Sequence, residues 1–99
     1  EEPMALDVYD DLFRAEGNEL YIKPATYYFS FNKKESITIP YGECTQASIL
    51  RNEVCMGIQY HADQGNKDKL FGVSLIPDKA EIITLTPDDG LITLAEDAS

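Results

Sequence analysis

The stretch Val54–Tyr60, with the sequence VCMGIQY, decides the fold of this chain because its apolar residues recur at every second position. Four large apolar side chains share one parity, namely Val54, Met56, Ile58 and Tyr60. A period of two is typical of a β-strand, whose successive side chains point to opposite faces. We therefore predict a strand here, with these four side chains on one face.

A second apolar run, Leu70–Ile76, follows the polar, glycine-containing loop 63–68. Two β-like runs joined by a polar loop are typical of an antiparallel hairpin, and we expect this pairing. Pro24 lacks the N–H that a sheet requires, so it closes its strand or places it at an edge. Further short strands are predicted at Glu19–Pro24, Ile82–Leu85 and, after the tight turn Thr86–Gly90, at Leu91–Ala95. Residues Ser36–Pro40 are expected to form a brief strand or an extended lead-in to the following helix.

Two segments are predicted to be short helices. In residues 5–15 the apolar side chains recur every three or four positions, at Leu6, Tyr9, Leu12 and Phe13. Gly17 and Asn18 then supply a left-handed stop. The second helix is expected over 41–51, beginning after Pro40, with an inner face formed by Cys44, Ala47 and Leu50.

These elements predict an α+β fold, in which two short helices pack on one face of a mostly antiparallel sheet of four to five strands. We interpret the aromatic cluster in residues 25–31 as core. At 99 residues the chain has room for one hydrophobic core, so residues 1–99 are expected to form a single domain. Because the sequence opens Glu1-Glu2-Pro3 without an initiating methionine, we expect it to be part of a longer multidomain protein.

Composition excludes several classes of protein. Apolar residues make up 43% of the sequence, which is ordinary for a folded domain. The net charge of −10 would repel a phosphate backbone, so nucleic acid is not an expected partner. No stretch approaches the roughly 20 consecutive apolar residues that a membrane-spanning helix needs, so direct membrane insertion is not expected.

The sequence offers little reactive chemistry, and we expect no catalytic residue and no cofactor. Its one histidine, His61, lies at the predicted end of a strand and is interpreted as a solvated residue. Cys44 and Cys55 do not form a C-x-x-C pair, which favours buried, reduced thiols. The glycine-rich phosphate-binding motifs and the H-E-x-x-H zinc motif are absent from the sequence.

Acidic turns provide the only candidates for a metal site. Hard cations such as Ca²⁺ and Mg²⁺ prefer oxygen ligands. Neither acidic turn follows the ligand order of an EF-hand loop, and aspartates also collect in ordinary solvated turns. Both interpretations stay open for the four candidates Asp63, Asp68, Asp88 and Asp89.

Three stretches resemble the middle region of Castor/Pollux-type ion channels and their bacterial relatives. They are Asp11–Phe13, Gly17–Pro24 and Ala47–Ile58, followed by Ile76-Pro77 and by Leu85–Asp97. The resemblance implies a fold similar to the C-terminal lobe of RCK domains, which assemble into gating rings. It implies a cytoplasmic regulatory domain of a membrane-embedded cation channel, a homo-oligomer whose partners are other subunits and the Rossmann-like domains of the parent channel.

The residues that carry this resemblance have structural explanations. A helix stop, the start of a strand and close packing account for Gly17, Asn18, Glu19, Arg51, Glu53 and Gly57. The expected function is therefore mechanical and non-enzymatic. The alternative is a separate acidic adaptor that docks a basic protein through Glu1–Glu19, where residues 1–20 contain seven acids and one base. An enzyme using His61 or Cys55 is the third hypothesis.

Overall fold

The computed structural model describes residues 19–96, so the predicted helix at 5–15 and its Gly17-Asn18 stop lie outside the described residues. The strands within this range are β1 (Glu19–Pro24), β2 (Ile37–Pro40), β3 (Val54–Gln59), β4 (Val73–Leu75), β5 (Ile82–Leu85) and β6 (Gly90–Ala95). The helices are α2 (Ala25–Tyr28), α3 (Tyr41–Ile49) and two 3₁₀ segments, η1 (His61–Asp63) and η2 (Lys67–Gly72).

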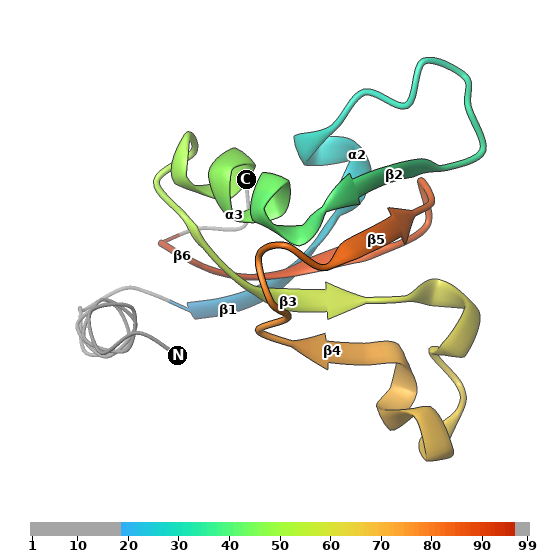
Figure 1. The fold of residues 1–99 in the computed structure, drawn as a ribbon. Helices are drawn as coiled ribbons and strands as arrows, with labels where there is room; N and C mark the ends of the chain where they lie inside the picture. Colours follow the sequence, from blue (N-terminus) through green and yellow to red (C-terminus); the bar gives the residue numbers. More distant parts are fainter. Residues whose placement is uncertain (1–18, 97–99) are drawn as a thin grey trace.

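The strands form two antiparallel sheets (Figure 1). A four-stranded sheet has the order β1-β6-β3-β4, and β2 pairs with β5 in a separate ribbon. Helices α2 and α3 lie above the four-stranded sheet together with β2. The predicted α+β class, with short helices on a mostly antiparallel sheet, is confirmed.

Pro24 explains where β1 ends and α2 begins. It closes β1, which is an edge strand as expected for a strand containing proline. The next amide, Ala25 N–H, donates to the carbonyl of Asp89 at 2.8 Å and joins the end of β1 to the start of β6. The short helix α2 was not predicted. It falls inside the aromatic segment 25–31, whose Phe31 is buried as expected.

Helix α3 begins at Tyr41, directly after Pro40, and ends at Ile49, two residues earlier than predicted. Its buried residues are Tyr41, Cys44 and Ser48. The predicted inner position of Leu50 is wrong, since this side chain is 85% exposed. The predicted face Cys44, Ala47 and Leu50 advances three residues at each step. Because a helix has 3.6 residues per turn, repeated steps of three rotate away from one face, whereas a step of three followed by a step of four stays on it.

Strand β3 has a bulge that breaks its simple alternation. Cys55 faces Thr93 and Gly57 faces Ile92 on β6, so one residue of β3 is extra between them. As a result Cys55 and Ile58 both point into the core, and the prediction that Val54, Met56 and Ile58 share one face is wrong. A Cβ on Gly57 would lie 2.2 Å from the carbonyl oxygen of Ser74, so only glycine lets β4 approach this closely.

The predicted hairpin is confirmed, because β3 and β4 pair antiparallel. Strand β4 is shorter than the run Leu70–Ile76 suggests. Leu70 and Phe71 adopt left-handed backbone with φ of 54° and 58°, and Ile76 does so with φ of 45°. Left-handed residues cannot continue a strand, so β4 is limited to three residues between them.

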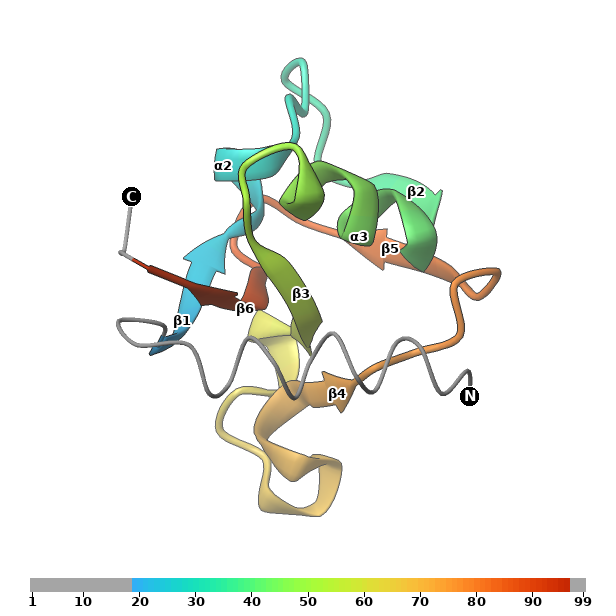
Figure 2. The ribbon, with the colours of Figure 1, turned by 90° about the vertical axis from the view of Figure 1, so that its left-hand side faces the viewer.

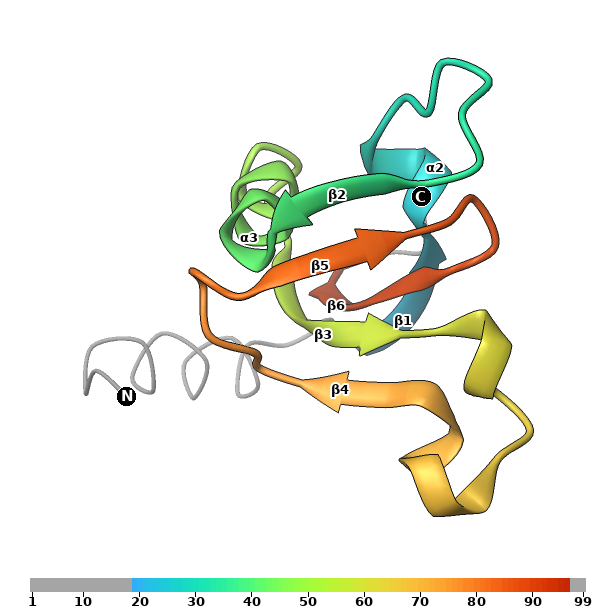
Figure 3. The same ribbon diagram turned by 45° about the vertical axis from the view of Figure 1, so that its right-hand side comes forward.

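The core lies between the four-stranded sheet and the elements above it (Figures 2 and 3). Tyr41 and Cys44 reach it from α3, and Ile83 and Leu85 reach it from β5. Cys55, Ile58 and Leu91 cover it from the sheet. Within residues 19–96, no helix is long and apolar enough to cross a membrane.

Candidate functional site

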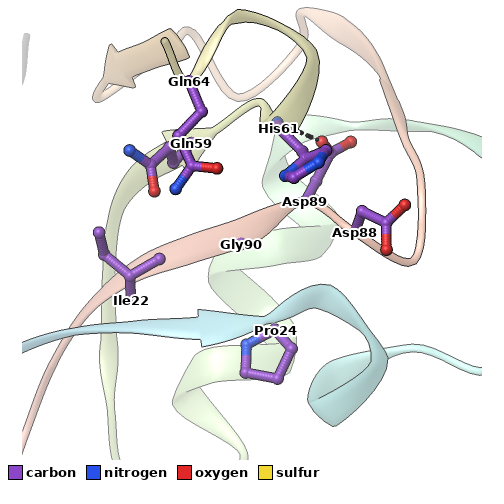
Figure 4. Close-up of a pocket in the computed structure, with 8 residues that line it drawn as sticks. All are labelled: Ile22, Pro24, Gln59, His61, Gln64, Asp88, Asp89 and Gly90. Carbon is purple, nitrogen blue, oxygen red and sulfur yellow. Dashed lines mark hydrogen bonds between the residues drawn. The ribbon is translucent and has the colours of Figure 1, made fainter. Parts of the chain in front are cut away.

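The first candidate site is a hollow beside His61, at the edge where β3 ends and β6 begins (Figure 4). Its volume of about 220 Å³ is below the range of roughly 300–1,000 Å³ that is usual for ligand pockets. The lining is mixed, and comprises Ile22, Pro24, Gln59, His61, Gln64, Asp88, Asp89 and Gly90. Its size favours a packing irregularity over a binding pocket.

Asp89, the only buried acid at this hollow, has a structural role. One carboxylate oxygen accepts the backbone N–H of His61 at 2.8 Å, and the other accepts the backbone N–H of Thr86 at 2.7 Å. Both bonds involve a charged acceptor and are therefore stronger than neutral ones. Asp89 thus joins the β5–β6 turn to the end of β3, and neither of its oxygens lacks a hydrogen bond.

A second, larger hollow of about 620 Å³ shares His61, Asp88 and Asp89 with the first. Its wall includes Glu35, Asp63 and Asp88, but these come from three different turns. Most of the lining side chains are themselves exposed, so the hollow is a depression in the surface and not an enclosed site.

The structure separates the four acidic candidates for a metal site. Asp63 lies 3.7 Å from the ammonium of Lys69, and Asp68 is exposed in η2. Asp88 is exposed, and Asp89 is engaged as described above. Within residues 19–96, no three His, Cys, Asp or Glu side chains are grouped so that they could hold a metal ion.

A buried polar cluster, which the sequence did not predict, lies at the β1 edge of the sheet. The ammonium of Lys23 donates to Oε2 of Glu53 at 2.5 Å, and both side chains are 4% exposed. The hydroxyl of Tyr28 donates to the other oxygen of Glu53 at 2.7 Å and lies 2.9 Å from the hydroxyl of Thr93. Burial above all, with the bond to Glu53 adding to it, raises the pKa of Tyr28 above its usual 10.0.

Aromatic rings complete this cluster. The ammonium of Lys23 lies 5.2 Å from the ring centre of Tyr27 and 5.6 Å from that of Tyr21. The guanidinium of Arg51 lies 4.2 Å from the Tyr27 ring and donates to the Tyr27 carbonyl at 2.9 Å. These contacts join β1, α2 and the turn after α3. The cluster therefore holds these elements together, with Lys23 paired to Glu53 and Arg51 bonded to the Tyr27 carbonyl.

The sequence contained one signal for this cluster. In β1, the side chains of Tyr21 and Lys23 project from the sheet face that is turned toward the helices, because these residues lie opposite Thr93 and Leu91 of β6. Hydropathy alone would place Leu20 and Ile22 inward instead. The resemblance singled out Arg51 and Glu53, and the structure gives both of them partners in this cluster.

The two cysteines are buried and free. Burial, with smaller contributions from Cys55 and Glu43, raises the pKa of the Cys44 thiol from 9.0 to about 12. Burial also raises the pKa of Cys55, whose sulfur lies 3.3 Å from the hydroxyl of Tyr41. Since the thiolate is the nucleophile, these thiols are poorly reactive at neutral pH. The side chain of His61 is exposed.

Exposed apolar side chains are the most pronounced surface feature. They occur at the end of α3 (Ile49 and Leu50), in η2 (Leu70 and Phe71), beside β4 (Leu75 and Ile76), on β1 (Leu20 and Ile22) and at the start of β5 (Ile82). Groups of exposed apolar side chains typically mark sites of protein interaction. No family model matches the sequence, and no curated protein matches it.

Proposed function

We propose that this chain is a non-catalytic regulatory domain of a cation channel, of the gating-ring type, on the cytoplasmic side of the membrane. In this role it couples subunit assembly or the binding of a ligand elsewhere in the parent protein to the pore. The sequence resemblance and the distribution of exposed apolar side chains support the proposal.

The observation that carries it is the placement of two apolar patches. We define the α3-end patch as Ile49 and Leu50, and the η2 patch as Leu70 and Phe71. The α3-end patch lies at the C-terminal end of α3, at the top of the molecule, and the η2 patch lies in the segment before β4, at the bottom (Figures 1 and 2). Leu50 is 85% exposed and Leu70 is 70% exposed, so both patches can contact a neighbour.

Two different patches at opposite ends suit head-to-tail assembly. When one patch of a subunit binds the other patch of the next subunit, the contact is heterologous and generates a ring if the rotation closes. A ring of this kind can regulate a pore, because a ligand that binds one arrangement of the ring more tightly shifts the population toward it. The domain then works by transmitting movement through its contacts.

The non-enzymatic part of the proposal is supported by the state of the reactive groups. The ammonium of Lys23 is paired with Glu53 in the interior. The thiols of Cys44 and Cys55 are buried, and their raised pKa values keep them protonated. A nucleophile or general base needs to be accessible and poised near the working pH, and these groups are neither.

The first experiment is to read the coding frame around Glu1 and reconstitute its full product in planar bilayers. We expect upstream membrane-spanning helices, a Rossmann-like domain and a cation current. Leu50→Asp and Phe71→Asp should each change the open probability while the single-channel conductance stays the same, since the pore itself is untouched. Lys34→Asp, on an exposed polar turn, is the matched control and should behave like the unmodified protein.

A coding frame of about the length of this chain, without membrane-spanning helices, would refute the channel proposal and favour the acidic adaptor. A full-length channel whose open probability is the same in both patch variants would refute the role of the patches. Loss of turnover on changing His61 or Cys55 would instead support the enzyme hypothesis.

A further inference from the structure

The four-stranded sheet has an apolar face turned away from α2 and α3. In antiparallel strands, residues directly opposite each other project from the same face. Thr93, Leu91, Cys55 and Ile58 face the core, so their neighbours of opposite parity face the other way. We define the outer face by six of these side chains, Leu20, Ile22, Val54, Leu75, Ile92 and Leu94.

The register arranges this face in two rows across the sheet. One row runs Ile22, Ile92, Gly57, Leu75 and crosses all four strands. The other runs Leu20, Leu94, Val54. Leu20, Ile22 and Leu75, at the two edges, are 54%, 56% and 65% exposed, whereas Val54 and Ile92 are half-buried and Leu94 is buried. A strand such as β6 that is apolar on both faces is typical of a sheet covered on both faces.

We propose that the outer face is the docking site of this chain's own N-terminal segment, residues 5–15, which binds it as an amphipathic helix. The sequence of this segment places Leu6, Tyr9, Leu12 and Phe13 on one side and acidic residues on the other. The apolar side matches the character of the two rows, and the acidic side would face solvent. This inference goes beyond the channel proposal and does not depend on it.

Length supports this occupant. A helix over residues 5–15 is about 16 Å long, at 1.5 Å per residue. The three spacings between the four strands add to about 14 Å. One helix of this length therefore reaches from β1 to β4 when it crosses the strands, as a row of the outer face does.

The connection to β1 sets the direction of the helix. Only residues 16–18 separate its end from Glu19, and the four steps from residue 15 to residue 19 span at most about 14 Å. That reach is only slightly more than the distance of about 10 Å between a packed helix and a sheet, so the end of the helix must lie near the start of β1. The proposal therefore requires Leu12 and Phe13 to face Leu20 and Ile22, and Leu6 to lie toward Leu75.

Tethering favours the N-terminal segment over a second copy of the chain as the occupant. A segment tethered by three residues has an effective concentration in the millimolar range without any association cost. The covalently attached segment therefore competes effectively with a separate molecule for the same face.

The test uses the full chain with isotope-labelled Leu, Ile and Val methyl groups. We expect nuclear Overhauser contacts from Leu12 to Leu20 and Ile22, and from Leu6 toward Leu75, that do not change with protein concentration. Leu12→Asn should lower the urea midpoint of unfolding by about 1 M or more. Asp11→Asn, which places the same residue on the acidic side, is the matched control and should leave the midpoint within about 0.3 M.

Three outcomes would overturn the proposal. One is the absence of contacts from Leu6 and Leu12 to the outer face in the unmodified chain. Another is contacts found only between molecules in a sample that mixes labelled and unlabelled chains, which would make a second copy the occupant. The last is an equal change of the midpoint in Leu12→Asn and Asp11→Asn. The contact measurement is made on the unmodified chain, so it decides the matter even if Leu12→Asn fails to fold.

Discussion

The two edges of the four-stranded sheet are built in opposite ways. At the β1 edge, a six-residue strand is held by the buried pair of Lys23 and Glu53. At the β4 edge, a three-residue strand lies between left-handed residues, with Phe71 before it and Ile76 after it. Regions with few buried contacts and strained backbone open at lower free energy than regions with many. The difference indicates that the β1 edge provides stability and that the β4 edge is available for contacts with neighbours.

The largest effect is expected at the β1 edge. Glu53→Gln leaves the ammonium of Lys23 buried without a carboxylate, which should lower the free energy of unfolding by about 3–5 kcal/mol. Urea unfolding followed by circular dichroism measures it. Glu35→Gln, at an exposed position, is the control and should cost less than about 0.5 kcal/mol.

The double substitution Lys23→Met with Glu53→Leu sharpens this test. Because no charge is then left unpaired in the interior, it should recover much of the loss. If Glu53→Gln cost no more than Glu35→Gln, the β1 edge would not be the anchor of the fold.

The next effect concerns the close approach of β4 to β3. Gly57→Ala brings a Cβ to 2.2 Å from the Ser74 carbonyl oxygen, so β4 must move. Overpacking of this kind should cost about 1–3 kcal/mol, and amide hydrogen exchange should rise in β4 but not in β1. Gly65→Ala is the matched control, since nothing lies within 4 Å of its added Cβ. Equal exchange at both edges would contradict the comparison.

Replacing one leucine by glycine at each edge should change stability by a smaller amount, with opposite sign at the two edges. Leu70 is left-handed, a conformation that glycine adopts without strain, so Leu70→Gly should stabilise the chain by up to about 1 kcal/mol. Leu20→Gly, at a similarly exposed leucine inside β1, should destabilise it by about 1 kcal/mol or more. Thermal unfolding of both variants measures the difference. A loss of stability in both would show that the backbone at Leu70 is not strained.

The smallest effect at neutral pH is expected in the core between the two edges. Burial raises the pKa of Cys44 from 9.0 to about 12, so above about pH 9 the unfolded chain releases a proton that the folded chain keeps. The contribution of Cys44 to stability should therefore be constant below about pH 9 and fall as the pH rises toward about 12. Cys44→Ala should reduce this slope. A stability profile that is flat between pH 7 and about 10.5 would contradict the raised pKa.

Local patterns predicted much of this fold. The positions of β1, β2, β5 and β6 follow from β-forming residues bounded by proline and polar turns, as does the pairing of β3 with β4. What could not be predicted depends on tertiary contacts. The bulge in β3 and the left-handed Leu70 and Phe71 arise from the approach of neighbouring strands, which a single strand's sequence does not report.

The candidate site was predictable only in part. Aspartates in turns suggested a metal site, but their side chains come from separate turns or bind backbone N–H groups, as Asp89 does. Lys23 and Glu53 are 30 residues apart, and no local pattern links them. The resemblance singled out Glu53 and Arg51, but it did not single out Lys23, so it did not predict the pair.

The central claim is that the α3-end patch of one chain binds the η2 patch of the next. The most direct test measures the self-association of residues 1–99, first unmodified and then in two variants that each carry a substitution in one patch. Sedimentation equilibrium from about 10 μM to about 1 mM, at salt high enough to screen the net charge of −10, should detect assembly of the unmodified chain. Leu50→Asp and Phe71→Asp should each be monomeric alone. An equimolar mixture should form one-to-one dimers and nothing larger, because only one intact pair of patches remains. A monomeric unmodified chain, or a mixture that stays monomeric, would contradict the account.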